Sequence, residues 1–162
     1  MEQLIEEFGH PTYISFPVMA ARLMLAAGFG AAIGFEREWR KRPAGLRTHI
    51  LVCVAAATFA VLTIEIIHAP MFALDSVKLD PIRLVEAVTA GVAVLAAGVV
   101  IFTRGEVHGL TTGAGMWLAG AVGLATALGY YLIAFGVALL AVLVLATLRV
   151  LAHKVIRGDD QS

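Results

Sequence analysis

The sequence predicts an all-α fold, a polytopic membrane bundle of about five transmembrane helices. Of its 162 residues, 60% are hydrophobic and 15% are charged, whereas soluble domains are about 45–50% apolar and about 25% charged. Apolar stretches of about 20 residues, the length of helix that crosses a bilayer core, recur along the chain. If these stretches cross the membrane, most of the basic residues fall on one side of it. The lipid bilayer is therefore the expected partner of the outward-facing side chains.

The predicted helices follow the apolar stretches in chain order. The first three are separated by polar residues and cover 17–34, 48–69 and 82–103. The last two share one run at 110–148, which is close to twice the length of a crossing and is expected to fold into a hairpin. Gly129-Tyr130-Tyr131 is the predicted turn, because glycine relaxes the backbone and tyrosine favours the membrane interface.

The chain is expected to form a single transmembrane domain with short flanks. Residues 1–16 are expected outside the cytoplasm, 17–149 form the bundle, and 150–162 form a cytoplasmic tail too short to fold alone. The acidic N-terminal segment lacks the basic region and short apolar core of a signal peptide. The first apolar segment is therefore expected to stay as a helix.

The distribution of Lys and Arg predicts the orientation in the membrane. With five crossings, nine basic residues fall on one side: Arg37, Arg40, Lys41, Arg42, Arg47, Arg104, Arg149, Lys154 and Arg157. Only Lys78 and Arg83 fall near the other side. The positive-inside rule then places the N-terminus outside and the C-terminus in the cytoplasm.

Polar residues gather at the predicted cytoplasmic ends of three helices, and they form the candidate functional site: Glu36, Arg37, Glu38, Arg47, Thr48, His49, Thr111 and Thr112. Two helix N-termini there offer free backbone N–H groups, and Arg47 offers a planar fork of donors, which together predict an anion site. Glu36 is expected to hold Arg47 in place, while Arg40 and Lys41 are interpreted as solvated topology charges. A solvated basic loop with ordinary threonine caps is the alternative, and cation binding by the glutamates is another.

A second charged cluster is predicted toward the outer side: Arg22, Glu65, Asp80, Arg83 and Glu86. Arg22 lies inside the first helix, where an unpaired charge is costly, so it is expected to pair with Glu86 or Glu65. Asp80-Pro81 is typical of a helix start, and Arg83 and Glu86 are three residues apart and can touch. Structural pairing and an ion or proton path are the two interpretations of this cluster.

The sequence contains no motif that indicates catalysis. Cys53 is the single cysteine, which excludes an intramolecular disulfide and a cysteine metal cluster. The histidines lack a metal-binding spacing such as HExxH, and no P-loop, dinucleotide fingerprint or Ser-His-Asp order is present. We therefore expect no catalytic residue, no metal and no cofactor, and the protein is predicted not to be an enzyme. The formal net charge of zero favours no nucleic-acid partner.

Small residues recur every four positions in two predicted helices, at Ala26, Gly30 and Gly34 and at Gly115, Ala119, Gly123 and Ala127. This spacing lines up small residues on one face, where helix backbones approach closely. Packing within the chain is the favoured interpretation, and a homodimer interface is the alternative.

The motifs GFERE at 34–38 and PAGLRTH at 43–49 closely resemble the signature of the MgtC/SapB family of membrane proteins. The resemblance continues at Asp80-Pro81-Ile82-Arg83, in the glycine-containing segment 91–98 and at Gly109-Leu110-Thr111-Thr112 with Trp117. Two of the family's usual glycines are alanines in 91–98, so closest contact of that helix is expected to be looser. The resemblance covers nearly the whole chain.

The resemblance implies a bacterial inner-membrane regulatory protein linked to adaptation to low magnesium and to intracellular survival and virulence. It also implies modulation of the membrane ATP synthase, so ATP synthase membrane subunits or other membrane proteins are the implied partners. Many family members carry a C-terminal domain of the ACT type, which is expected to be lacking here. A small oligomeric ion transporter or channel is the alternative function. The absence of ionisable residues between Leu23 and Phe35 favours regulation.

Overall fold

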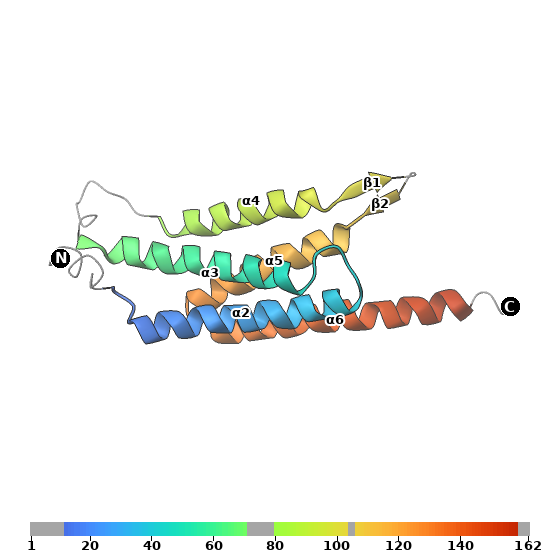
Figure 1. The fold of residues 1–162 in the computed structure, drawn as a ribbon, viewed down its shortest axis with the longest axis horizontal. Coiled ribbons are helices and arrows are strands. Elements are labelled where there is room, and N and C mark those ends of the chain that lie inside the picture. The colour runs from blue at the N-terminus through green and yellow to red at the C-terminus, as the bar shows by residue number, and fades with distance from the viewer. Residues whose placement is uncertain (1–11, 71–79, 104–105, 159–162) are drawn as a thin grey trace.

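The computed structural model describes residues 12–70, 80–103 and 106–158, which fold into five helices and one short hairpin. The helices lie side by side along the long axis of an elongated bundle (Figure 1). Their bounds, with those of the two strands, are α2 Phe16–Trp39, α3 Leu46–His68, α4 Ile82–Gly98, β1 Ile101–Thr103, β2 Glu106–His108, α5 Leu110–Ala127 and α6 Tyr131–Gly158. The prediction of an all-α bundle of about five helices is confirmed.

The predicted turn between the last two helices is also confirmed. Helix α5 ends at Ala127 and α6 begins at Tyr131. Between them Gly129 has a φ of 88°, in the left-handed region that glycine adopts without steric cost. The predicted start of α4 is confirmed as well, because an Asp80 carboxylate oxygen accepts a hydrogen bond from the N–H of Ile82 at 3.0 Å.

The prediction of one helix over 82–103 is wrong in its last part. Helix α4 ends at Gly98, and residues 101–103 pair with 106–108 in an antiparallel hairpin in which Phe102 lies opposite Val107. Gly109, with a φ of 90°, follows the hairpin, and a Cβ at this position would overlap the carbonyl oxygen of Val99. Only glycine fits this return of the chain. Hydropathy alone does not distinguish the helix from the strand that follows it, because Ile101 and Phe102 are as apolar as the residues of the helix.

The prediction that the last helix ends near residue 149 is also wrong. Helix α6 continues to Gly158 and therefore includes most of the segment expected to be a separate tail. Neither glycine nor proline occurs between residues 137 and 157, so nothing in the sequence interrupts the backbone hydrogen bonds. The predicted boundary followed the loss of hydropathy, which marks the end of the lipid-facing part and not the end of the helix.

Three of the described helices are long and apolar enough to cross a membrane: α2, α3 and α5. Helix α4 has 17 residues, and the apolar part of α6, Tyr131–Thr147, has the same length. At 1.5 Å per residue each spans about 25 Å, somewhat less than a typical hydrocarbon core. Large apolar side chains such as Leu132, which is 89% exposed, cover the outside of the bundle. A surface of this kind is stable in lipid.

Helix α5 is the centre of the bundle and packs against α2, α3, α4 and α6. Eleven of its 18 residues are buried. Its small residues lie against neighbouring backbones: a Cβ on Gly123 would overlap the carbonyl oxygen of Cys53. Gly30 of α2 lies equally close to α3, because a Cβ there would lie 2.7 Å from the carbonyl oxygen of His49. These glycines serve packing within the chain, the interpretation favoured from the sequence.

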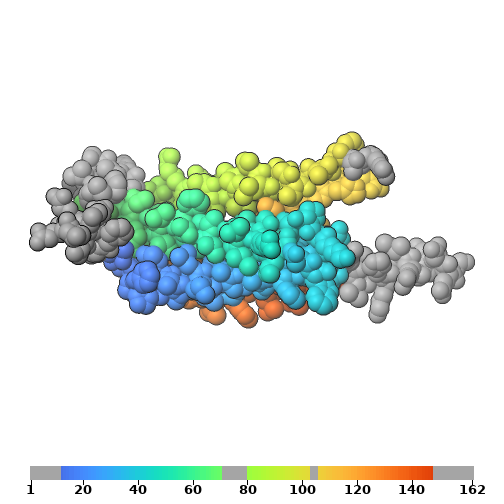
Figure 2. Space-filling view, viewed as in Figure 1, coloured from blue at the N-terminus to red at the C-terminus, as the bar shows by residue number. Residues whose placement is uncertain are grey.

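Helix α4 lies at the edge of the bundle. Val92 is its one buried residue, and a Cβ added at Gly91 or Gly98 would meet no other atom within 4 Å. Figure 2 shows α4 as a ridge beside α3, with a furrow between them. This furrow is an apolar groove of about 710 Å³. The close contact of α4 with α5 comes from glycines of α5 instead, because a Cβ on Gly113 would lie 3.1 Å from the carbonyl oxygen of Ala96. The looser contact expected from the two alanines stays a prediction.

Candidate functional site

A pocket of about 510 Å³ lies where the end of α2, the start of α5 and the middle of α6 meet. Its polar lining residues are Glu36, Arg37, Arg40, Arg42, His108, Thr111 and Thr112. In Figure 1 the α2–α3 connection, the β-hairpin and the start of α5 all lie at the right-hand end of the bundle. Segments far apart in the sequence thus meet at one end of the molecule.

The last turns of α2 supply the charged wall of the pocket. Glu36 and Arg40 are four residues apart, on the same face of the helix, and form an ion pair. Arg37 faces the bundle instead and is 5% exposed. Its Nη2 donates a hydrogen bond of 3.0 Å to the hydroxyl oxygen of Thr112 in α5, so this guanidinium joins α2 to the start of α5.

Glu36 is held between two guanidinium groups. Its side chain is 10% exposed, and one carboxylate oxygen lies 3.9 Å from Nη1 of Arg37. Both oxygens are buried, and beyond these ion pairs neither accepts a hydrogen bond from the part of the chain that the structure describes. Removing one partner of a buried ion pair costs about 3–5 kcal/mol. The neighbouring arginines therefore keep Glu36 in place.

The start of α5 faces the same pocket. At this end the N–H of Gly113 donates a hydrogen bond to the carbonyl of Gly109, and no side chain of the described residues caps the N-terminus of the helix. The hydroxyl of Thr112 accepts from Arg37, and Thr111 is exposed on the pocket side. The first N–H groups of a helix lack intrahelical partners and carry partial positive charge. This end of α5 therefore adds to the positive potential of the arginines.

The structure brings only part of the predicted site together. Glu36, Arg37, Thr111 and Thr112 line the pocket, whereas Arg47, Thr48, Glu38 and His49 do not. Glu38 instead accepts a hydrogen bond of 3.0 Å from the N–H of Leu46 and so supports the start of α3.

Arg47 is exposed, and the prediction that Glu36 holds it is wrong. Arg40 takes that place, so its interpretation as a solvated topology charge is also wrong. Its side chain is 29% exposed and reaches the carbonyl of Ala146 in α6 at 3.5 Å. The four-residue spacing of Glu36 and Arg40 on one helix was the signal that could have found this pair.

His49 is fully buried between α2 and α5. Its Nδ1 lies 2.9 Å from the carbonyl oxygen of Gly45, one turn earlier in the chain. Its Nε2 has no hydrogen-bond partner among the described residues and points toward Gly115, where an added Cβ would lie 3.2 Å away. His49 thus belongs to the packing beneath the pocket and not to its lining.

The outer-side charged residues do not form one cluster. Arg22 donates hydrogen bonds to the carbonyl of Ala127 at 2.8 Å and to the hydroxyl of Tyr131 at 3.2 Å. Among the described residues it forms no ion pair with Glu65 or Glu86, so the predicted pairing is wrong. The physical reason is that the carbonyl groups at the C-terminus of α5 lack intrahelical partners and carry partial negative charge.

The remaining acidic residues of that side have other contacts. Glu65 accepts hydrogen bonds from the N–H groups of Tyr13 at 2.7 Å and Ile14 at 2.9 Å. It thereby fixes the segment before α2 to the end of α3. Arg83 lies 3.9 Å from Asp80 and not beside Glu86, and both members of that pair are exposed. These contacts indicate a structural role for the outer-side residues.

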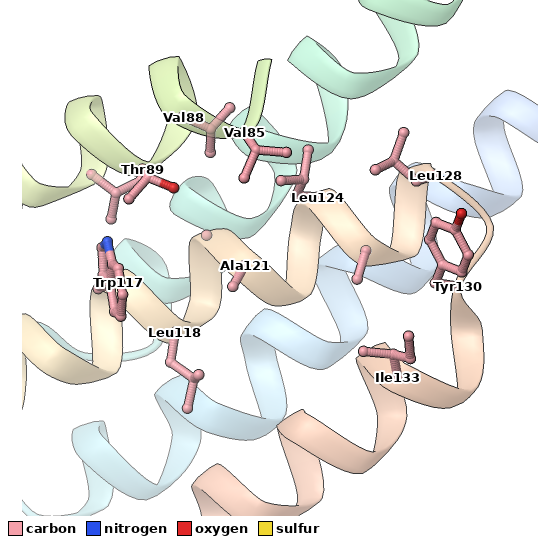
Figure 3. A pocket seen from close by; sticks show the side chains of 13 residues that line it. Val85, Val88, Thr89, Trp117, Leu118, Ala121, Leu124, Leu128, Tyr130 and Ile133 are labelled. Carbon is pink, nitrogen blue, oxygen red and sulfur yellow. The ribbon is translucent and has the colours of Figure 1, made fainter. Parts of the chain in front are cut away.

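Two other cavities of the described residues are lined mainly by apolar side chains, although Asp80 and Arg83 lie at the groove between α3 and α4. Figure 3 shows one of about 300 Å³ between α4, α5 and the start of α6, into which Val88, Leu124 and Ile133 project. Charged side chains are absent from its lining. Within the described ranges, no three His, Cys, Asp or Glu side chains are grouped as metal ligands would be. The pocket of α2, α5 and α6 is therefore the candidate site.

The model of the MgtC family matches residues 23–154, which is most of the chain. The chain belongs to the MgtC family. The resemblance inferred from the motifs is thereby confirmed, and with it the assignment to a membrane family of helical bundles. The pocket lies entirely within the matched residues.

Three relatives illustrate the similarity within the MgtC family. The "Putative magnesium transporter YhiD" of Escherichia coli K12 is 39% identical over 68% of this chain and 51% of its own length. Protein SapB of Bacillus subtilis is 36% identical over 74% of this chain and 51% of its own length. Protein MgtC of Brucella suis is 38% identical over 66% of this chain and 42% of its own length. The chain thus spans about half the length of the curated relatives it matches. No solved structure matches it.

Proposed function

We propose that this protein is a non-enzymatic regulatory protein of the bacterial inner membrane that acts in adaptation to low magnesium and in intracellular survival. Its site is the pocket of α2, α5 and α6, which takes an anion or an anionic group of a partner. The name of the YhiD relative supports the link to magnesium. The proposed target is the membrane part of the ATP synthase, following the resemblance to the family.

The observation that carries this proposal is the charge of the pocket. Three arginines and one glutamate line it, so the positive charges exceed the negative ones by two. The uncapped N-terminus of α5 points to the same place. An anion would meet Arg40, Arg42 and free N–H groups there, and no proton-transfer or nucleophilic step is needed.

A small oligomeric ion transporter or channel is the second candidate, favoured by the name of the YhiD relative. The interior of the described bundle supports regulation instead. Between the pocket and Arg22, the buried residues of α2 are Ala26, Gly30, Ile33 and Gly34, which are all apolar. A transport path would need a continuous series of polar groups along this stretch. Beside it in α3, His49 is the one polar side chain among the buried residues of that helix, so α2 and α3 together provide no such series.

Growth in low magnesium tests the proposal. A strain lacking its own copy would express the full chain, the Arg40→Gln variant or the Arg47→Gln variant at matched levels in the membrane. Both variants remove one guanidinium, but only Arg40 lines the pocket. We expect Arg40→Gln to lose most of the growth benefit and Arg47→Gln to keep it.

Two outcomes would contradict this expectation. Wild-type growth of both variants would show that the pocket is not needed for the function. Equal growth with and without the wild-type chain would show that the protein has no role in adaptation to low magnesium. Capture of ATP synthase membrane subunits with the wild-type chain, but not with Arg40→Gln, would support the proposed target.

A further inference from the structure

The pocket has two chemically different walls. The charged wall comes from the end of α2 and includes Arg40 and the exposed Arg42. The other part of the lining is apolar and includes Leu110 of α5 with Val144 and Leu145 of α6. A free inorganic anion would leave the second wall without a partner. A ligand that joins an anionic group to an apolar chain would satisfy both walls.

Glu36 adds a requirement for a hydrogen-bond donor. Its carboxylate lines the pocket and is nine-tenths buried. One oxygen is in contact with Nε of Arg40, whereas the other lies 3.9 Å from Nη1 of Arg37 and accepts no hydrogen bond from the described residues. The ion pair with Arg40 balances its charge, but a buried carboxylate is stabilised further by hydroxyl or amine donors. The preferred ligand therefore carries a donor close to its anionic group.

The apolar wall continues along the outside of α6. Leu140 and Val144 are four residues apart, so they lie on one face of the helix. Their exposed fractions are 59% and 44%. Together they form an apolar strip that leads from the pocket along the lipid-facing part of the bundle. An acyl chain would lie on this strip without leaving the bilayer.

We propose that the pocket binds an anionic phospholipid whose headgroup carries hydroxyl groups, of the phosphatidylglycerol class. The phosphate faces Arg40, Arg42 and the N-terminus of α5, a headgroup hydroxyl donates to Glu36, and one acyl chain follows Val144 and Leu140. The excess of two positive charges favours an anionic headgroup over a zwitterionic one, and basic pockets between transmembrane helices are typical sites for anionic headgroups. This inference rests on the proposed function, because it names the ligand of the same site.

Native mass spectrometry of the full chain in neutral detergent tests the inference. The chain would be titrated separately with dioleoyl phosphatidylglycerol, dioleoyl phosphatidylethanolamine and dioleoyl phosphatidylcholine. We expect phosphatidylglycerol to bind about tenfold more tightly than phosphatidylcholine. We expect Arg42→Gln to lower its affinity by about tenfold, the loss typical of one charge-assisted hydrogen bond. Arg42 forms no side-chain hydrogen bond or ion pair with the described residues, so this variant leaves Glu36 and Arg40 paired.

Arg47→Gln is the matched control, because it removes the same group outside the pocket and should keep the wild-type affinity. Equal binding of the three lipids, or equal loss in Arg42→Gln and Arg47→Gln, would overturn the inference. Displacement of bound phosphatidylglycerol by an equal concentration of glycerol phosphate would also overturn it and would assign the pocket to a free phosphate ester. The growth test is separate: loss of growth in Arg40→Gln without lipid selectivity would keep the proposed function and reject the lipid.

Discussion

Two arginines of α2 bind the two ends of α5. Arg37 donates to the Thr112 hydroxyl at the start of α5, and Arg22 donates to the carbonyl of Ala127 at its end. The second contact places a cation beside the partial negative charge of a helix C-terminus, which is a favourable arrangement. It also satisfies a carbonyl group that has no intrahelical partner. Arg22 is thus stabilised inside the bundle without a carboxylate.

We predict that Arg22→Gln lowers the thermal stability of the protein in detergent, while Arg83→Gln leaves it unchanged. Hydrogen bonds from a charged donor contribute about 1.5–3 kcal/mol each, whereas the one contact of Arg83 within the described ranges is an exposed ion pair with Asp80. Measurement of the unfolding midpoint for both variants tests this. If Glu86→Gln lost as much stability as Arg22→Gln, the result would support an ion pair between Arg22 and Glu86 and would contradict the contacts of Arg22 described above.

The sequence predicted which residues need partners better than which partners they have. The position of Arg22 within an apolar helix required a polar contact, but the carbonyl of Ala127 has no side-chain signature. The assignment of Arg40 failed for another reason, because all basic residues near the α2–α3 connection were interpreted together as topology charges. One of them, Arg47, is exposed, while Arg37 is buried. Whether such an arginine is buried or exposed depends on the face of the helix on which it lies. A count of charges does not give that face.

The helices differ in how closely they pack. Gly123 of α5 lies against the backbone of α3, and Gly30 of α2 lies against the same helix from another side. These contacts leave no space for a side chain. Helix α4 has open space beside its glycines and apolar cavities on both sides. We therefore expect α2, α3 and α5 to form the rigid part of the bundle and α4 to exchange its amide hydrogens faster.

We predict that Gly123→Ala destabilises the protein strongly, while Gly28→Ala does not. The new methyl group at 123 would overlap a backbone carbonyl, and overpacking of this kind costs about 1–3 kcal/mol. A Cβ at Gly28 meets no other atom within 4 Å, and alanine has a higher helix propensity than glycine. Unfolding midpoints in detergent and yields of folded protein test both variants. Similar stability of the two would refute the close contact between α5 and α3.

Hydropathy predicted the helices well because burial in lipid and membership of a helix coincide over most of this chain. The prediction failed at the two places where they separate. Residues 101–103 are apolar but form a strand, and the end of α6 extends beyond the apolar stretch as a helix. At the first place, the decisive signal is Gly109, whose positive φ turns the chain from the hairpin into α5. An apolar stretch alone does not reveal such a turn.

At the scale of the whole molecule, the pocket and the α2–α3 connection share one end of the bundle, and the start of α2 lies at the other end (Figure 1). Arg40, Arg42 and Arg47 all belong to the first of these ends. Following the positive-inside rule, we propose that this end faces the cytoplasm. The proposed ligand would then bind in the cytoplasmic leaflet.

We predict that a cysteine at position 41 is protected from an impermeant maleimide in spheroplasts and reacts after the membrane is permeabilised. A cysteine at position 15, before α2, should react in both conditions. Both substitutions, Lys41→Cys and Ser15→Cys, are made in a Cys53→Ala background and fall on exposed residues. Labelling of position 41 in intact spheroplasts would reverse the proposed orientation.

The two arginine contacts of α5 also limit how the bundle can move. Arg37 and Arg22 belong to the same helix and hold α5 near its opposite ends. If α5 slid along α2 by one turn, about 5.4 Å, both hydrogen bonds would break at once. Piston-like displacement between these two helices is therefore unfavourable, and a signal from one membrane face to the other would have to travel by tilting α2 and α5 as one body or by moving α4 alone.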